Sequence, residues 1–227
     1  MMLILRLHPK YELEKVWDFV DKEFKDHPSK DVLPLFASHA ENRNHVSVLI
    51  ETESMDAIAD LLVNQIAKCE EITRTRTITL MKPAFFPVPR DIPRGMSRFM
   101  VMLSVRPKSY SDVYNNLIRM KRPLDIYFSY AAYSCGKEDV RISAIARDWD
   151  SLRAFVNKSV STLKGVKSTT IMRIRRSMRL TTPKKWLEHQ KKYAVSRLTG
   201  EPAKGGYEYD WTFIEHCTLH GALPDEI

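Results

Sequence analysis

Residues 46–58, VSVLIETESMDAI, share a pattern with residues 140–152, VRISAIARDWDSL, and this repeat indicates the fold. Each stretch opens with apolar residues at alternating positions, which is typical of a β-strand, and continues into the beginning of a helix. The two stretches are offset by 94 residues, and at this offset Asp56 aligns with Asp150 and Ile58 with Leu152. The alignment predicts that the chain contains two copies of one structural unit.

The repeat extends beyond these stretches on both sides. Ile72 aligns with Val166 at the same offset, whereas residues 3–9 align with residues 101–107 at an offset of 98, so the first copy has a connection that is four residues longer. Both copies predict the order β-α-β-β-α-β. In the second copy, we expect Asp148 to cap the second helix and Gly165 to end it in a left-handed conformation. The expected helical core positions are Val16, Val20, Phe24, Ile58, Leu61, Leu62 and Ile66 in the first copy, and Val113, Leu117, Met120, Leu152, Phe155, Val156, Val160 and Leu163 in the second.

This order predicts an α+β fold of two ferredoxin-like βαββαβ modules, each with two helices on one face of a four-stranded antiparallel sheet. The uncovered faces of two such sheets can pack together, which predicts an internal dimeric α/β barrel. We expect module 1 at 1–82, module 2 at 98–180, and an extension at 181–227 with a helix over 183–199 and an aromatic strap at 207–213. The linker at 83–97 is rich in proline, which suits neither a helix nor a central strand.

The composition narrows the class of protein. The chain has 227 residues, of which 44% are hydrophobic, enough to build packed cores. Gly95 is the first of seven glycines and no glycine-rich phosphate loop occurs, which excludes the common nucleotide-binding motifs. Three widely spaced cysteines form neither a disulfide framework nor a zinc site, and no apolar run is long enough to cross a membrane. These features predict a soluble, cytoplasmic protein without membrane contacts.

The positive charge is concentrated in one segment. The chain has a net charge of +8, and residues 164–192 contain ten Lys or Arg residues and a single Glu, so the rest of the chain carries −1. Such a patch is either a solvated strand and helix face or the site of an acidic protein partner, which we rank above weak, nonspecific nucleic-acid binding. Its expected contact residues are Arg173, Arg175, Arg176, Arg179, Lys184, Lys185, Lys191 and Lys192.

Three stretches of the second copy carry a resemblance to a known family. They are Gly136-Lys-Glu-Asp139-Val at the hairpin, Asp150-Ser-Leu-Arg-Ala-Phe155 at the second helix, and Gly165-Val-Lys-Ser-Thr-Thr170 before the last strand. Over about 99–180 the second copy resembles the ligand-binding (RAM) module of Lrp/AsnC-type transcription regulators. Residues 1–82 resemble it more weakly, because Asn42 and His45 replace the hairpin glycine and aspartate.

The resemblance implies both a fold and a function. Modules of this family pair sheet to sheet as dimeric α/β barrels and bind small ligands, often amino acids, near the glycine-x-x-aspartate turn. The family's regulators also carry an N-terminal helix-turn-helix, for which a first strand at Met2 or Leu3 leaves no room. We therefore expect a stand-alone, non-enzymatic sensing and assembly module in transcription regulation, which acts through protein contacts, can form homo-oligomers and needs no cofactor.

The resemblance also implies the ligand-binding residues. Gly136 and Asp139 would hold an α-ammonium group at the hairpin, whereas the ordinary alternative is that Asp139 caps its own backbone. Asn42 and His45 would offer different chemistry at the equivalent turn of the first copy, so the two sites need not bind alike.

Two arginines suggest a different ligand. Arg74 and Arg76 share one face of the strand expected at 72–80, because side chains alternate along a strand. They either pair with carboxylates, which we favour, or bind an anionic ligand through forked hydrogen bonds. The second option supports an alternative function, since dimeric α/β barrels include enzymes that act on haem-like tetrapyrroles, such as sirohaem decarboxylases. His8, His39 and His45 together with these arginines could serve such a substrate.

Two further hypotheses rest on less. A second alternative function is a direct, nonspecific nucleic-acid binder that uses the basic segment at 164–192. His216, Cys217 and His220 would share one side of a helix, but the sequence offers no second cluster of ligands, so we expect no metal. No nucleophile elbow and no H-E-x-x-H motif occurs, and our main expectation is therefore a protein without catalytic activity.

Overall fold

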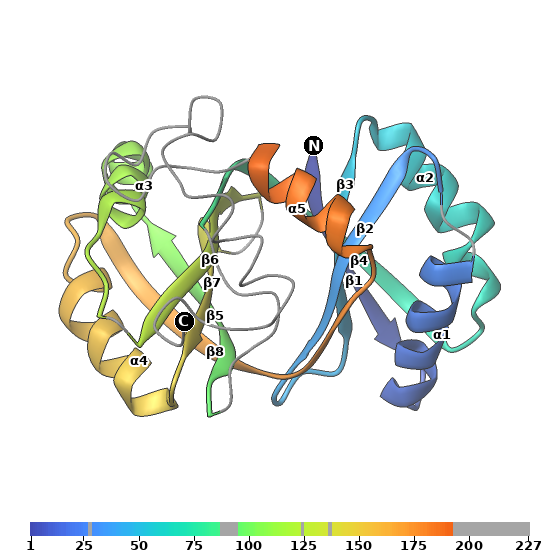
Figure 1. Ribbon diagram of the computed structural model, residues 1–227, viewed down its shortest axis with the longest axis horizontal. Helices are drawn as coiled ribbons and strands as arrows, with labels where there is room; N and C mark the ends of the chain where they lie inside the picture. The colour runs from blue at the N-terminus through green and yellow to red at the C-terminus, as the bar shows by residue number, and fades with distance from the viewer. Residues whose placement is uncertain (27–28, 87–94, 124, 136–137, 193–227) are drawn as a thin grey trace. The chain divides into compact units, whose positions relative to one another are not determined.

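The computed structural model describes residues 1–26, 29–86, 95–123, 125–135 and 138–192. The chain divides into two compact units, which Figure 1 shows. Unit 1 comprises Met1–Met81 and Ile174–Thr182, and unit 2 comprises Lys82–Arg173 and the chain from Pro183 onwards. In the described residues, no helix is long and apolar enough to cross a membrane.

Unit 1 has the predicted order of elements. These are β1 (Met2–Pro9), α1 (Leu13–Asp26), β2 (Val32–Ala40), β3 (Val46–Thr52), α2 (Met55–Asn64), a 3-10 turn at Ile66–Lys68 and β4 (Ile72–Phe85). β1 lies between β3 and β4, and β2 pairs with the other edge of β3; all these pairs are antiparallel. Both helices cover the same face of the sheet (Figure 1). The leucines of β1 at positions 3, 5 and 7 are fully buried against them.

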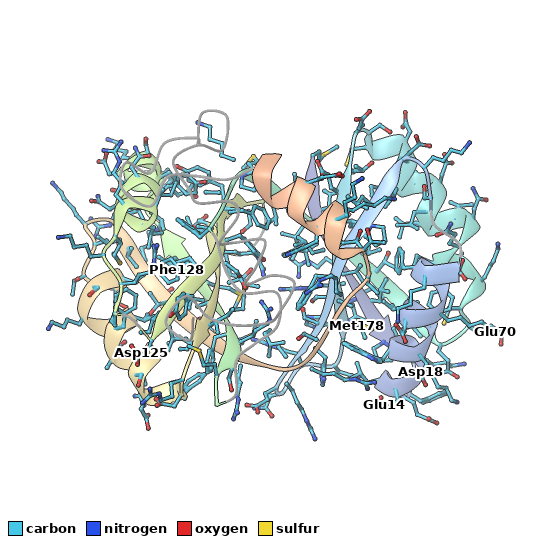
Figure 2. All side chains as sticks on the ribbon, viewed as in Figure 1. Glu14, Asp18, Glu70, Asp125, Phe128 and Met178 are labelled. Atoms are coloured by element: carbon cyan, nitrogen blue, oxygen red, sulfur yellow. The ribbon has the colours of Figure 1, made fainter. Side chains whose placement is uncertain are left out.

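Unit 2 repeats this arrangement. Its elements are β5 (Ser97–Val105), a 3-10 turn at Pro107–Ser109, α3 (Tyr110–Arg119), β6 (Ile126–Ser134), β7 (Val140–Ala146), α4 (Trp149–Phe155), a π-helical turn at Val156–Val160, β8 (Val166–Arg179) and α5 (Pro183–Lys192). β7 lies between β5 and β6, antiparallel to both. Phe128 of β6 is buried between the sheet and the helices α3 and α4 (Figure 2).

Two strands are shared between the units. Ile174–Arg179 of β8 lies in unit 1, where it pairs with β2, and Lys82–Phe85 of β4 lies in unit 2. Just beyond β4, the backbone N–H of Phe86 donates to the carbonyl of Ser129 in β6 at 3.1 Å. The strand order β1-β3-β2-β8-β5-β7-β6-β4 therefore closes on itself. This order and the two βαββαβ modules confirm the predicted fold class of an α/β barrel.

The local signals of the sequence are confirmed in detail. The Asp148 carboxylate accepts from the Ser151 N–H at 2.7 Å and caps α4, and the equivalent Ser54 caps α2. Gly165 has a φ of 101°, a conformation that favours glycine. The expected helical core positions are buried, apart from Leu62, Met120 and Leu163, which are half-buried against the cores.

Other expectations are corrected or lie outside the described residues. β4 continues to Phe85, so the first residues of the expected linker are part of a strand. Pro83 is tolerated there because proline withholds a single N–H group and is found near strand edges and irregularities; Lys82, directly before it, has a φ of 47°. The helix that begins at Pro183 is described as far as Lys192. The aromatic strap at 207–213, and His216, Cys217 and His220, lie outside the described residues.

Candidate functional site

Arginines and a histidine lie opposite each other on β1 and β4 of unit 1. The antiparallel register pairs Arg6 with Arg76 and His8 with Arg74. Directly paired residues of two antiparallel strands project to the same side of the sheet. Because the alternating leucines of β1 point towards the helices, Arg6 and His8 lie on the face of the sheet that the helices leave uncovered.

His45, directly before β3, belongs to the same group. Its ring centroid is 5.1 Å from that of His8, and 8% of the residue is exposed. Burial, followed by the positive charge of Arg6, lowers the pKa of His45 to about 3. The His45 ring is therefore neutral at physiological pH.

His8 is also held in its neutral form. Burial lowers its pKa, the charges of Arg74 and Arg6 lower it further, and a hydrogen bond with the Asn44 backbone opposes them. A hydrogen bond that raises the pKa of an imidazole is one that the ring donates, so the other nitrogen of a neutral ring is an acceptor. The Nε2 atom of His8 is buried and has no hydrogen-bond partner within the described residues. His8 therefore has a proton-accepting nitrogen that no described residue uses.

The guanidinium groups on β4 are exposed. Neither Arg74 nor Arg76 forms an ion pair with a carboxylate in the described part of the chain, so the favoured expectation of carboxylate pairing has no support there. Arginine binds carboxylate and phosphate groups through two parallel hydrogen bonds. We call Arg6, His8, His45, Arg74 and Arg76 the Arg/His cluster. Chemically, it can bind an organic anion and accept a proton from it.

The other candidates from the first copy, Asn42 and His39, lie outside this cluster. Asn42 has a φ of 57° and forms the turn between β2 and β3. The Nε2 atom of His39 is hydrogen-bonded to the carbonyl of Arg43 at 2.8 Å. His39 pairs in register with Arg176, whose guanidinium stacks on Trp17 of α1 at 4.4 Å. His39 therefore lies on the helical side of the sheet and does not join the Arg/His cluster.

Asp139 is fully engaged inside unit 2. One carboxylate oxygen accepts from the N–H of Val105 at 2.7 Å and from the hydroxyl of Ser104 at 3.3 Å. The other accepts from the hydroxyl of Tyr110 at 2.5 Å. Asp139 thus joins the β6–β7 hairpin to β5 and to the start of α3, whereas Gly136 lies outside the described residues. The structure places Asp139 in a different unit from Asn42 and His45.

The basic segment is divided between several environments. Arg176 also forms an ion pair with Glu14, and Arg173 donates to the hydroxyl of Ser97 at 3.2 Å. Arg175 is exposed and Arg179 is half-buried. Lys184 and Lys185 are exposed on α5, which also contains Lys191 and Lys192. Residues 174–182 belong to unit 1 and the remainder of the segment to unit 2, so the segment is not confined to one unit.

The sequence interpretation missed Arg6 and the tyrosines of unit 2. Arg6 alternates with the buried leucines of β1, and this alternation is the signal that could have identified it. The rings of Tyr114 and Tyr133 stack with their centroids 4.4 Å apart. The Tyr114 hydroxyl donates to the carbonyl of Lys82, and burial raises the pKa of this phenol. No sequence signal predicts that contact, because it depends on β4 reaching unit 2.

Comparison with known proteins identifies the fold. No protein-family model matches the sequence, and no curated protein matches it. Among solved structures, an anthrone oxidase-like protein matches with a TM-score of 0.50 and 9% identity, over 80% of this chain and 94% of that one. A mutant chlorite dismutase from Candidatus Nitrospira defluvii matches with a TM-score of 0.50 and 7% identity, over 77% and 91%. At such identities the likeness shows the fold alone, the dimeric α/β barrel.

These matches correct the expected family. The matched structures are named as enzymes or enzyme-like proteins, not as Lrp/AsnC-type regulators, so the identification with the RAM module is wrong. The expectation of a non-enzymatic sensing module in transcription regulation, made on that basis, is wrong with it. The matches also give no support to an amino-acid ligand, an acidic protein partner or a nucleic acid.

The physical reason lies in the residues that carried the resemblance. Asp139 joins elements of unit 2, and Gly165 supplies a left-handed conformation before β8. Asp150 occupies the first turn of α4, where a carboxylate is favourable to the helix dipole. In unit 2 these residues serve the fold, whatever the unit binds. The residues that resemble the RAM module therefore indicate the fold and do not identify the family.

Proposed function

We propose that the protein is an enzyme of the dimeric α/β-barrel type that binds an organic polyanion at the Arg/His cluster, with a carboxylate-bearing, haem-like tetrapyrrole as its substrate. The observation that carries the proposal is the pairing of His8 with Arg74 and of Arg6 with Arg76 across β1 and β4. This pairing collects three guanidinium groups and a partnerless imidazole nitrogen on one face of a sheet.

The charge of the cluster favours an anionic substrate. Cations placed side by side repel each other, and a bound anion relieves this repulsion. Carboxylate groups on flexible arms, such as the propionates of a tetrapyrrole, match the forked donors of Arg74 and Arg76. That the solved structures sharing this fold include an oxidase-like protein and a chlorite dismutase is compatible with a catalytic role.

The histidines supply the proton chemistry. A neutral His8, with its Nε2 available, would accept a proton from a bound acid or hold it during the reaction. His45 would act as a positioning residue, because its buried, neutral ring packs against that of His8 and adds no further positive charge.

The test is an absorbance titration of the full chain with haem and with a metal-free porphyrin. We expect a Soret shift on binding. Arg74→Ala and Arg76→Ala should each weaken binding about 10- to 100-fold, the equivalent of one charge-assisted hydrogen bond of about 1.5–3 kcal/mol. Arg147→Ala, which removes an exposed arginine of unit 2, is the matched control and should not change binding.

Turnover is tested on the bound complex by mass spectrometry, which detects loss of a carboxylate or any other change in the tetrapyrrole. His8→Ala should lower the rate of conversion while binding is retained. If neither haem nor porphyrin shifts the spectrum, or if Arg147→Ala weakens binding as much as Arg74→Ala, the tetrapyrrole proposal fails.

A further inference from the structure

The helices α2 and α4 are equivalent in the repeat but differ in their exposed surfaces. At the offset of 94 residues, the N-cap Ser54 corresponds to Asp148, and both caps accept a hydrogen bond from the backbone N–H three residues later. At exposed positions the chemistry changes, because Ala59 corresponds to Arg153. The internal duplication has therefore kept the helices and altered their solvent-facing sides.

On α2, the exposed side is apolar with an acidic border. Met55 is 50% exposed and Val63 is 69% exposed. Together with exposed Ala59 they are spaced four residues apart and form one line along the helix. Asp56 and Asp60 are exposed beside them. We call these five residues the α2 surface. Large exposed apolar side chains in such a line are typical of an interaction site.

On α4, the equivalent line is aromatic and basic. Trp149 is 39% exposed, and two exposed residues follow at the same spacing of four: Arg153, and Asn157 in the π-helical turn after the helix. We call these three residues the α4 surface. Asp150, the equivalent of Asp56, is exposed beside Trp149. Tryptophan and arginine are the residue types most enriched among energetically dominant interface positions. The α4 surface therefore has the composition of a binding site, with Arg153 in place of Ala59 and Ala154 in place of Asp60.

The charge difference extends over the helical side of each unit. Residues 10–26 and 53–71, which contain α1 and α2, carry a net charge of −6. Residues 106–122 and 147–167, which contain α3 and α4, carry a net charge of +7. Glu14, Asp18 and Glu70 project from the helical side of unit 1 (Figure 2). Complementary fields of this kind guide association and fix its orientation.

We propose that the α2 surface of one copy of the chain binds the α4 surface of a second copy. Charge complementarity identifies the occupant, since the segments that contain α1 and α2 are acidic and those that contain α3 and α4 in every copy are basic. The chain's own aromatic segment, with Glu208, Asp210 and Glu215 and no basic residue over 207–215, has the same sign as α2 and is not attracted to it. Because the two surfaces differ, the contact is head-to-tail, and it extends to further copies until a ring closes.

The experiment measures the mass of the full chain in solution by size-exclusion chromatography with light scattering. The wild-type protein should associate as its concentration rises, and less so at high salt. Val63→Arg places a positive charge in the apolar line of the α2 surface, and Arg153→Glu reverses the charge of the α4 surface. Each variant should remain a single chain. Mixed in equal amounts, these two variants should form dimers and nothing larger, because each retains one intact surface.

Several results would overturn the proposal. They are a wild-type protein of single-chain mass at all concentrations, association that survives either variant, and variants that remain single chains after mixing. The last result would instead indicate a symmetric contact. Tyr11→Ser, which removes an exposed ring outside α2 without changing the charge, is the control for nonspecific hydrophobic association and should associate as the wild type does. Circular dichroism verifies folding, and Met55→Lys replaces Val63→Arg should that variant be unfolded.

Discussion

Substitution of Gly165 by alanine tests how tightly the turn before β8 is constrained. Gly165 has a φ of 101°, and its carbonyl accepts from the N–H of Arg106 at 2.8 Å. A Cβ atom at this position would lie 2.2 Å from the Cβ and 2.3 Å from the Oγ of Ser109, at the start of α3. The alanine variant therefore meets both an unfavourable backbone conformation and a steric overlap.

The two effects can be estimated separately. A left-handed conformation costs an L-residue about 1–2 kcal/mol, and forcing an extra carbon into a packed site costs about 1–3 kcal/mol. Alanine also lowers the conformational entropy of the unfolded chain, which offsets the loss of stability by about 0.5–1 kcal/mol. We expect Gly165→Ala to lower the free energy of unfolding by about 1–4.5 kcal/mol. For a chain of this size, the melting temperature should fall by roughly 2–18 °C.

Thermal unfolding followed by circular dichroism measures this loss. Ser109→Gly in the Gly165→Ala background removes the overlapping Cβ, so it should recover the steric part, about 1–3 kcal/mol, and leave the backbone part. The reasoning is refuted if Gly165→Ala melts with the wild type. It is also refuted if Ser109→Gly brings no recovery, because the overlap would then not be the source of the loss.

Three further predictions concern buried polar groups. Tyr114→Phe leaves the carbonyl of Lys82 without its donor and should lower the free energy of unfolding by about 1–3 kcal/mol in a urea titration. His45, with a folded-state pKa of about 3, stays neutral while the unfolded chain takes up a proton below about pH 6.5; stability should therefore fall by about 2 kcal/mol from pH 8 to pH 5, and His45→Gln should remove that loss. Asp139→Ala leaves the hydroxyl of Tyr110 without an acceptor and should cost about 1–3 kcal/mol, a loss that shrinks in a Tyr110→Phe background in a double-mutant cycle.

The predictions that held were those that depend on neighbouring residues in the chain. The burial of Val16, Val20 and Phe24 follows from helical spacing, and the cap at Asp148 follows from the residue type in front of an apolar run. The offset of 94 residues made both modules recognisable at once, because a repeated pattern is unlike random sequence.

The predictions that failed needed information from distant parts of the chain. Arg74 and Arg76 were placed on one face by alternation, but their neighbours Arg6 and His8 depend on the register between β1 and β4. That register is set by tertiary packing, which alternation within one strand does not determine. The family was misjudged for a related reason. An aspartate at position 139 suits either a ligand site or a contact between a hairpin and the neighbouring strand, and the sequence alone does not distinguish them.

The exchange of strand ends by β4 and β8 has a consequence for the ancestry of the chain. A single ancestral module that exchanged its last strand with a second copy would have been an intertwined dimer. Fusion of two such genes would place both exchanged strands in one chain. Separating the halves by cutting the chain within 87–94 would remove residues 174–182 from unit 1 and expose the free edge of β2. Unpaired strand edges promote aggregation. We therefore expect each half to aggregate when it is produced alone and to stay in solution when both halves are produced together.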